Sequence, residues 1–316
     1  MSSLNRRFVG ITAAAVLTAA LVPLNAVTAD AAVTHGTSTN PARIGLYGQQ
    51  TPKYDGVYRQ GLTILALTDS GATVDPTAIR WLRRQQCDNG KFMSFRSDLT
   101  QSCGAADSNA TAMAIMAFRA IGRNAAAQDA FQWLMNQQLP GGGWEYTAGW
   151  GADSNSTGLV VQAMIAMGVD PTTVNSQGTA IDFLKSVQLR CDEPDADQRG
   201  ALDYLPEPVL IRNDYATAQA TQALARTTLP VAPEPGSTAL PELSCGAKAT
   251  NERVGSVSAT AAAAGYLGRR LEAHSGTIPN AFGGGSDYGS TANAVLSLVA
   301  AGYGANQVTS AMTALE

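Results

Sequence analysis

The chain alternates long apolar stretches with short polar phrases rich in Gly, Asp and Asn. Residues 112–118, 158–167 and 292–301 are apolar on almost every side, as is typical of helices packed between neighbours. Residues 78–86 and 181–188 carry their apolar positions on one face, as is typical of helices with one solvent side. The pattern therefore predicts an all-α protein with two kinds of helix, an inner and an outer kind.

Capping residues mark the expected helix boundaries. Asp, Asn or Ser precedes the inner stretches and can accept hydrogen bonds from free backbone amides, while Gly71, Gly122, Gly168 and Gly302 follow them and favour a left-handed end. Inner helices are expected at residues 57–70, 107–121, 153–167, 213–226 and 287–301. Outer helices are expected at residues 76–87, 127–138, 178–189, 257–273 and 305–315. The chain is thus predicted to form five helical hairpins.

One five-residue phrase opens four of the inner helices. It reads Asp-Ser-Asn-Ala-Thr at 107–111, Asp-Ser-Asn-Ser-Thr at 153–157, Asn-Asp-Tyr-Ala-Thr at 213–217 and Asp-Tyr-Gly-Ser-Thr at 287–291. A repeated helical hairpin usually cannot bury its apolar face alone. The hairpins are therefore expected to stack into a solenoid or to close into a ring.

A second recurring element lies in the outer helices, where an aromatic residue and Leu are followed by Gln. It occurs as Trp81-Leu82 with Gln86, Trp133-Leu134 with Gln138, and Phe183-Leu184 with Gln188, and the loops behind it carry Gly90-Lys91-Phe92, Gly142-Gly143-Trp144 and, more loosely, Gly200-Ala201-Leu202. A Gln near a helix end can satisfy free backbone groups, and a flat aromatic ring can fill the seam between hairpins. These residues are therefore predicted to hold the repeats together.

This aromatic-Leu-x3-Gln element with its Gly-x-Trp loop resembles the repeat shared by squalene and oxidosqualene cyclases, protein prenyltransferase β subunits, and cobalamin carriers of the transcobalamin and intrinsic-factor type. The match spans about residues 54–305, and residues 133–144 are its most specific part. The resemblance implies an α/α toroid of repeated helical hairpins. In such a toroid, inner helices surround a central axis, outer helices surround them, and a ligand funnel opens where the inner helices begin.

The resemblance does not extend to the catalytic groups of those enzymes. Squalene-type cyclases protonate their substrate with an Asp-x-Asp-Asp motif, and the nearest sequence here, Asp-Glu-Pro-Asp-Ala-Asp at 192–197, does not match. Prenyltransferase β subunits hold zinc with Asp, Cys and His, but the predicted inner helices contain no Cys or His. The cobalamin carriers are secreted, disulfide-bonded, and bind a corrinoid through polar side chains at inner-helix starts. They also add a C-terminal β domain, which does not occur here before Glu316.

The resemblance therefore favours an extracellular binding module that captures a small or polycyclic ligand in the funnel. A corrinoid is the first candidate ligand, and a membrane importer is a candidate partner. The alternative is an enzyme, either of the terpenoid cyclase/prenyltransferase-like superfamily or an α/α toroid polysaccharide lyase or hydrolase, with Asp153 and Asp287 as acid and base. A ring that only binds other proteins is a third possibility. No cofactor is expected, and no catalytic residue is assigned.

Polar side chains at the inner-helix starts are the candidate ligand contacts. If these starts share one end of the ring, the side chains converge on one mouth. Amides inside apolar helices are further candidates, because they are costly unless they are paired or face a wet cavity. The Asp and Asn residues are also ordinary helix caps, so both roles stay open. The candidate residues are Asp107, Asn109, Asp153, Asn155, Asp214, Tyr215, Asp287, Tyr288, Gln162, Gln219, Gln222, Asn293, Trp144 and Trp150.

The N-terminus has the three parts of a secretory signal peptide. Arg6 and Arg7 precede the apolar run 9–22, and Ala29-Asp30-Ala31 offers a small-x-small cleavage site. We expect a signal peptide at residues 1–31, an N-terminal extension that packs on the ring at 32–55, and the toroid domain at 56–316. No later stretch is apolar for long enough to cross a bilayer, so secretion without membrane insertion is predicted.

The four cysteines of an exported chain favour two disulfides, because oxidised thiols persist outside the cytoplasm. Three pairings are possible. Cys87 with Cys103 and Cys191 with Cys245 is preferred, because the first pair flanks one loop and the second lies around the two longest irregular insertions. Each bond would pin a loop at the rim of the ring.

Composition argues against two other kinds of partner. The chain has no Cys-x-x-Cys pair, and His35 and His274 are its only histidines, so a zinc site is disfavoured. The formal net charge is −4, whereas nucleic-acid-binding proteins present concentrated positive charge. Nucleic acid is therefore not an expected ligand.

Overall fold

The described residues form the ten α-helices that the sequence predicts. The computed structural model describes residues 40–48, 51–173, 177–232, 236–243, 245, 257–281 and 283–316. The inner helices are α2 (Gly56–Asp69), α4 (Ser108–Ala120), α6 (Ser154–Ala166), α8 (Asp214–Leu224) and α10 (Tyr288–Ala301). The outer helices are α3 (Pro76–Gln85), α5 (Asn124–Met135), α7 (Ala180–Ser186), α9 (Ala259–Ala273) and α11 (Ala305–Leu315). The predicted boundaries are confirmed to within three residues.

Short elements complete the described part of the chain. A single 3-10 turn, η1 (Ala196–Gln198), lies in the insertion before α8, and β1 (Ile278–Pro279) pairs antiparallel with β2 (Ser286–Asp287) before α10. The predicted signal peptide, residues 1–31, lies outside the described residues.

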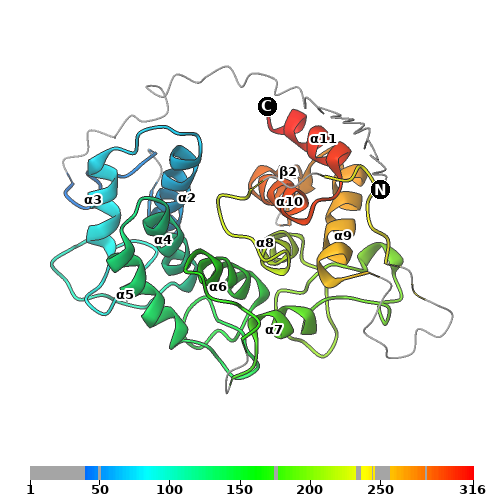
Figure 1. The fold of residues 1–316 in the computed structure, drawn as a ribbon, viewed down its shortest axis with the longest axis horizontal. Coiled ribbons are helices and arrows are strands. Elements are labelled where there is room, and N and C mark those ends of the chain that lie inside the picture. The colour runs from blue at the N-terminus through cyan, green and yellow to red at the C-terminus, as the bar shows by residue number, and fades with distance from the viewer. Residues whose placement is uncertain are drawn as a thin grey trace, which may run out of the picture. The chain divides into compact units, whose positions relative to one another are not determined.

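The inner helices pack on one another in chain order. α2 lies against α4, α4 against α6, α6 against α8, and α8 against α10. Each outer helix packs on the inner helix that precedes it, so that α3, α5, α7, α9 and α11 flank this series (Figure 1). The ends of the inner series, α2 and α10, stand apart in that view. The fold is therefore an α/α toroid of five hairpins.

Small residues let neighbouring inner helices approach closely. A Cβ on Gly158 of α6 would lie 3.2 Å from the Ala220 backbone of α8, and a Cβ on Gly61 of α2 would lie 2.7 Å from the Met113 side chain of α4. Side chains at these positions would push the helices apart, and close-packed interiors tolerate such overpacking poorly. Glycines, as well as large apolar side chains, therefore shape the contacts between neighbouring inner helices.

The opening phrase caps its helix in the predicted way. Asp107 Oδ1 accepts a hydrogen bond from the Ala110 N–H at 2.9 Å, and Asp153, Asn213 and Asp287 each accept from the amide three residues ahead. Four inner helices end in left-handed glycines, with φ of 73° at Gly71, 71° at Gly122, 76° at Gly168 and 72° at Gly302. Both cap predictions are confirmed.

The threonine at the fifth residue of the phrase anchors the loop that enters each hairpin. Thr111 Oγ1 accepts a hydrogen bond from the Phe92 N–H at 3.1 Å and donates to the Asp107 carbonyl at 2.7 Å. The equivalent loop-to-threonine bonds join Trp144 to Thr157, Leu202 to Thr217 and Ile278 to Thr291, at 2.9, 2.8 and 2.9 Å. All four threonines are fully buried.

The recurring Gln joins one outer helix to the next. Gln86 Nε2 donates to the carbonyls of Gly90 and Ala126 at 3.1 and 2.9 Å. Gln138 and Gln188 make the same two kinds of bond, to a loop glycine and to a residue next to or in the following outer helix. Their predicted structural role is therefore borne out.

Residues 40–48 supply the loop of the first hairpin. Gln60 replaces the anchoring threonine there: its Oε1 accepts from the Tyr47 N–H at 2.8 Å, and its Nε2 donates to the Gly45 carbonyl at 2.9 Å. The Trp81 indole N–H donates to the Ala42 carbonyl at 2.6 Å. These contacts place residues 40–48 on α2 and α3.

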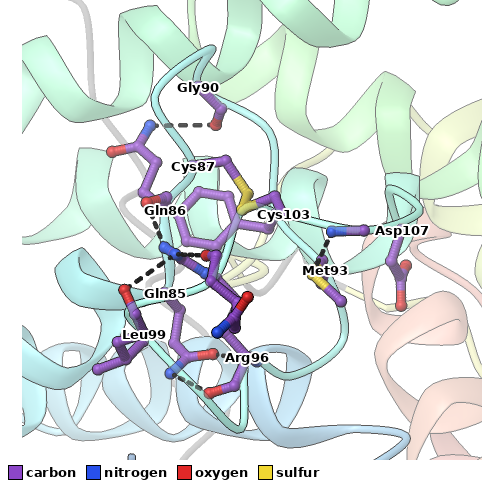
Figure 2. The surroundings of a disulfide bond; sticks show 12 residues. Gln85, Gln86, Cys87, Gly90, Met93, Arg96, Leu99, Cys103 and Asp107 are labelled. Atoms are coloured by element: carbon purple, nitrogen blue, oxygen red, sulfur yellow. Dashed lines mark hydrogen bonds between the residues drawn. A yellow bond between two sulfur atoms is a disulfide. The ribbon is translucent and has the colours of Figure 1, made fainter.

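Two disulfides, Cys87–Cys103 and Cys191–Cys245, join the predicted partners. The first closes the loop that leads to Asp107 (Figure 2). Inside that loop the Arg96 guanidinium donates to backbone carbonyls on both sides, including Gln86 at 3.2 Å. The loop is thus fixed by a covalent bond and by a partly exposed hydrogen-bond network around Arg96. Among the described residues, no helix combines the length and apolar character needed to span a membrane.

Candidate ligand site at the inner-helix starts

The third residue of each opening phrase forms one set of equivalent positions. In the first hairpin this residue is Tyr58, because the Val57 N–H donates to the Ser94 carbonyl just as the Ser108 N–H donates to the Tyr146 carbonyl in the second. We call the members of this set the third-position residues. They are Tyr58, Asn109, Asn155, Tyr215 and Gly289.

Third-position side chains from helices far apart in sequence meet at the helix starts. Gln219 Nε2 of α8 lies 3.3 Å from the hydroxyl oxygen of Tyr58 and 3.3 Å from that of Tyr215. Asn109 Nδ2 donates to Asn155 Oδ1 at 3.2 Å. The first contact joins α2 to α8, which are not neighbours in the inner series. The contacts thus pair Asn109 with Asn155 and bring Gln219 to Tyr58 and Tyr215.

Several polar atoms in this cluster have no hydrogen-bond partner within the protein. They include Asn109 Oδ1, Asn155 Nδ2 and Gln219 Oε1, all buried from solvent. One bond between two amides leaves a carbonyl and an NH2 group over, whichever way the amides are turned. Buried groups of this kind are costly unless water or a ligand satisfies them. The cluster therefore contains buried, uncharged donor and acceptor groups that have no hydrogen-bond partner within the protein.

Two buried carboxyl groups lie beside the cluster. Burial raises the pKa of Asp107 to about 6, against hydrogen bonds from the Ala110 amide and the Tyr146 hydroxyl that lower it. Burial likewise raises the pKa of Asp153 to about 6, against hydrogen bonds from Ser156. Both carboxyls therefore exchange protons close to neutral pH.

A tyrosine from the loop that leads into the next hairpin lies near each of these aspartates. Burial, and then the charge of Asp107, raises the pKa of Tyr146 to about 12. Burial, and then the charge of Asp153, raises the pKa of Tyr204 to about 12. Both hydroxyls therefore stay protonated at neutral pH and act as hydrogen-bond donors.

A cavity of about 660 Å³ opens beside the cluster, between the starts of α8 and α10. Its walls include Tyr204, Tyr215 and Asp287. Volumes of this size are typical of sites for small molecules. The side chain of Asp214 also borders the cavity but is engaged elsewhere: it accepts from Arg270 at 2.8 Å and from the Tyr266 hydroxyl.

The remaining predicted residues take different places. Trp144 is buried in the core, where its indole N–H donates to the Leu134 carbonyl at 2.8 Å, so it does not face the helix starts. Gln222 lies in the seam between α8 and α10, with its Nε2 3.4 Å from Ser297 Oγ and 3.5 Å from the Asn293 carbonyl. The Asn293 side chain donates to its own helix, at the Gly289 carbonyl.

Three further candidates differ in exposure. Gln162 is buried in α6, and its Oε1 has no partner in the protein. Tyr288 and Trp150 are 60% and 67% exposed. Among the described residues, no cluster of His, Cys, Asp or Glu is arranged to hold a metal ion.

Sequence reasoning missed Tyr58, Tyr146 and Tyr204. Tyr58 escaped because Gln60 stands where the other phrases have threonine, which hid the fifth copy of the phrase. The other two had a usable signal, since each follows the loop residue anchored by threonine at an offset of two, as Trp144 to Tyr146 and Leu202 to Tyr204.

Solved structures with a similar fold support this architecture. A type II terpene cyclase, MstE from Scytonema in its apo form, aligns with a TM-score of 0.51 and 15% identity over 83% of this chain and 68% of that one. A protein from Actinoplanes aligns with a TM-score of 0.50 and 17% identity over 83% of this chain and 70% of that one. No family model matches the chain, and no curated protein matches it.

At these sequence identities, the similarities establish the toroid fold alone and do not identify an activity. These two structures do not support the expected likeness to cobalamin carriers, since one is named as a terpene cyclase and the other carries no named activity. The two disulfides are compatible with the predicted extracellular location.

Proposed function

We propose that the chain is a binding module for a small, uncharged and polar ligand held at the inner-helix starts. The observation that carries this proposal is the set of buried, unpartnered amide atoms on Asn109, Asn155 and Gln219. Gln219 also contacts the hydroxyls of Tyr58 and Tyr215. Together these residues come from four inner helices, α2, α4, α6 and α8. A ligand with several hydroxyl or amide groups would satisfy them, whereas a hydrocarbon would leave them unpaired.

The charges around the cluster also favour an uncharged ligand. None of the third-position residues is cationic, and of the two arginines that border the adjoining cavity, Arg270 is paired with Asp214 and Arg212 is exposed to solvent. An anionic ligand would meet Asp107 and Asp153 without a free positive partner at the third positions. The proposal includes an extracellular location, which rests on the signal-peptide pattern and the disulfides.

The experiment is a titration of the purified chain with fixed probes. Isothermal titration calorimetry uses cyanocobalamin and four neutral hexasaccharides, namely cellohexaose, xylohexaose, chitohexaose and maltohexaose, with solubilised squalene as the apolar comparison. Saturable binding of a polar probe is expected, and replacing Tyr58 and Tyr215 together by Phe should weaken it about tenfold or more, because two hydroxyl contacts are removed. Binding of squalene alone, or no binding at all, would contradict the proposal.

An enzyme is the second candidate, and the raised pKa values of Asp107 and Asp153 favour it. A general acid works best when its pKa lies near the working pH, and both carboxyls have a pKa of about 6. Each uses Oδ1 as a helix cap, and the Tyr146 hydroxyl also bonds the Asp107 carboxyl, as the Ser156 side chain bonds that of Asp153. In this version of the function, one of them protonates a ligand bound at the third positions.

Product analysis separates the two functions. Squalene and the four hexasaccharides are incubated with the chain at pH 5 and pH 7.5, and the products are identified by mass spectrometry. Turnover that disappears in both Asp107→Asn and Asp153→Asn, while the probe still binds, establishes acid catalysis. Unchanged probes, recovered with saturable binding, leave the binding module as the function.

A further inference from the structure

An exposed tryptophan, Trp150, lies in the loop that also carries Tyr146. Trp150 lies in the loop between Trp144 and Asp153, which pair with each other in a short antiparallel bridge at the base of the loop. Its side chain is 67% exposed. The same loop carries Tyr146, whose hydroxyl bonds the Asp107 carboxyl beside the third-position residues. The indole is thus linked to the Asp107 carboxyl through Tyr146 and is not buried in the core.

Hydrogen bonds order the backbone of the loop that carries Trp150. The Glu145 carboxylate accepts three backbone hydrogen bonds, from Gly149, Trp150 and Gly151, at 2.9, 3.0 and 3.1 Å. Both glycines have positive φ, of 90° and 84°, which lets the chain fold around the carboxylate. The backbone is therefore ordered by hydrogen bonds, although the ring that it carries remains open to solvent.

A second aromatic ring supports the first. The rings of Tyr146 and Trp150 meet edge to face, with centroids 5.8 Å apart and an interplanar angle of 65°. This geometry is favourable for aromatic pairs and leaves a broad face of the indole uncovered. An exposed tryptophan costs solvation free energy, and neither the core nor a neighbouring helix recovers it here.

We infer that the Trp150 indole is a stacking platform for a sugar ring and that the ligand of the third-position residues is a neutral saccharide chain. This inference rests on the proposed function and names its ligand class. A pyranose ring has an apolar C–H face, which packs on an aromatic plane, and hydroxyls around its edge, which need donors and acceptors. The platform supplies the plane, and Asn109, Asn155 and Gln219 supply the unpaired polar atoms.

Other ligand classes fit fewer of these features. A polyisoprenoid would use the indole but would bury the amides unpaired. A phosphorylated or carboxylated ligand would find no cation at the third positions and two aspartates close by. A saccharide longer than one ring would also reach the cavity of about 660 Å³ bordered by Tyr204 and Tyr215. An extended, uncharged sugar chain uses all of these parts together.

The test compares substitutions at Trp150 with a matched control. Calorimetric titration of the full chain with the four hexasaccharides should show saturable binding of at least one of them. Trp150→Ala should weaken that binding about tenfold or more, because central aromatic contacts dominate such sites. Trp150→Phe should stay within about threefold, since it keeps a ring. Met312→Ala, which trims an exposed apolar side chain on the outer helix α11, should change nothing.

Fluorescence adds a readout that is independent of affinity. Trp81 and Trp144 are buried and Trp133 lies half-buried on the outer helix α5, so the exposed indole of Trp150 should account for most of the spectral shift when a hexasaccharide binds. The shift should disappear in Trp150→Phe although binding persists. A shift that survives in that variant contradicts the platform.

The outcomes distinguish this inference from the proposed function. If cyanocobalamin binds and is lost in the Tyr58→Phe and Tyr215→Phe double variant, while no hexasaccharide binds, the inference is wrong and the proposed function stands. If Trp150→Ala leaves hexasaccharide binding unchanged, the inference is likewise wrong and the proposed function stands. Failure of every polar probe to bind overturns both.

Discussion

The third and fifth residues of the opening phrase lie within one turn of the same helix, yet their hydrogen bonding differs. Every fifth-position threonine is buried and bonds the loop amide in front of it. The third-position residues are Tyr, Asn, Asn, Tyr and Gly in chain order, and Asn109 and Asn155 keep unpaired polar atoms. The position that keeps threonine in four of the five hairpins thus has a structural role, whereas the more variable third position carries polar atoms without a partner in the protein.

The largest expected effect on stability comes from a fifth-position threonine. Thr157→Val keeps the shape of the side chain but leaves the buried Trp144 N–H without its acceptor. We expect the free energy of unfolding to fall by about 2 kcal/mol, the cost of a buried unsatisfied amide. Urea denaturation followed by circular dichroism measures it.

The control for Thr157→Val is Thr309→Val. Thr309 lies on α11, and its exposed hydroxyl bonds only a carbonyl of its own helix. The change there should stay within about 0.5 kcal/mol. Equal losses of unfolding free energy at the two positions would mean that the bond from Thr157 to the loop does not stabilise the fold beyond an ordinary surface hydroxyl.

An intermediate effect is expected at the first residue of the phrase. Asn213 shows that an amide can cap an inner helix, so Asp107→Asn keeps the cap and removes a desolvated charge. At pH 7.5 the variant should be more stable than the wild type, on the order of 1–2 kcal/mol.

The pH dependence of this gain follows from the raised pKa of Asp107. The folded protein holds the proton up to a pKa of about 6, whereas the unfolded chain releases it near 3.8. The favourable contribution of the protonated carboxyl is complete below about pH 4 and is lost as the pH rises through 6. The difference between Asp107→Asn and wild type should therefore vanish at low pH. A constant difference between pH 4 and pH 7.5 would show that the charge of Asp107 is not its cause.

The smallest effect on stability is expected at the third position. Asn155→Ala removes a side chain whose Nδ2 has no partner and whose Oδ1 accepts a single bond from Asn109. The unfolding free energy should change by less than about 0.5 kcal/mol, since alanine also favours the helix. A loss as large as that of Thr157→Val would make the third position structural and remove the contrast between the two.

The parts that the sequence predicted correctly are those fixed by local chemistry. The caps at Asp107 and Gly122 depend only on residues within one turn, and the Cys87–Cys103 bond closes one short loop. The recurring phrase then gave the helices their order. The same local logic also indicated which side chains begin each inner helix, and the contact of Asn109 with Asn155 follows from it.

The parts that escaped prediction depend on contacts between distant segments. The side chain of Asp214 shares its place in the phrase with Ser154, but Arg270 and Tyr266 of α9 engage it, and no pattern around residue 214 signals those partners. Tyr58 meets Gln219 across 161 residues, and that contact exists only once the hairpins are arranged around each other. The cavity beside α8 has the same origin.

The most direct test of the ligand site measures binding and stability on one pair of variants. Tyr215→Phe and Thr217→Val change two residues of the same helical turn, one at the third and one at the fifth position. Titration with the tightest-binding polar probe should show about tenfold weaker binding for the combined Tyr58→Phe and Tyr215→Phe variant, and its urea midpoint should also fall, because Gln219 Nε2 loses both hydroxyl partners. Thr217→Val should lower the midpoint but leave the affinity of the folded protein unchanged. Full affinity in the tyrosine double variant would contradict the account.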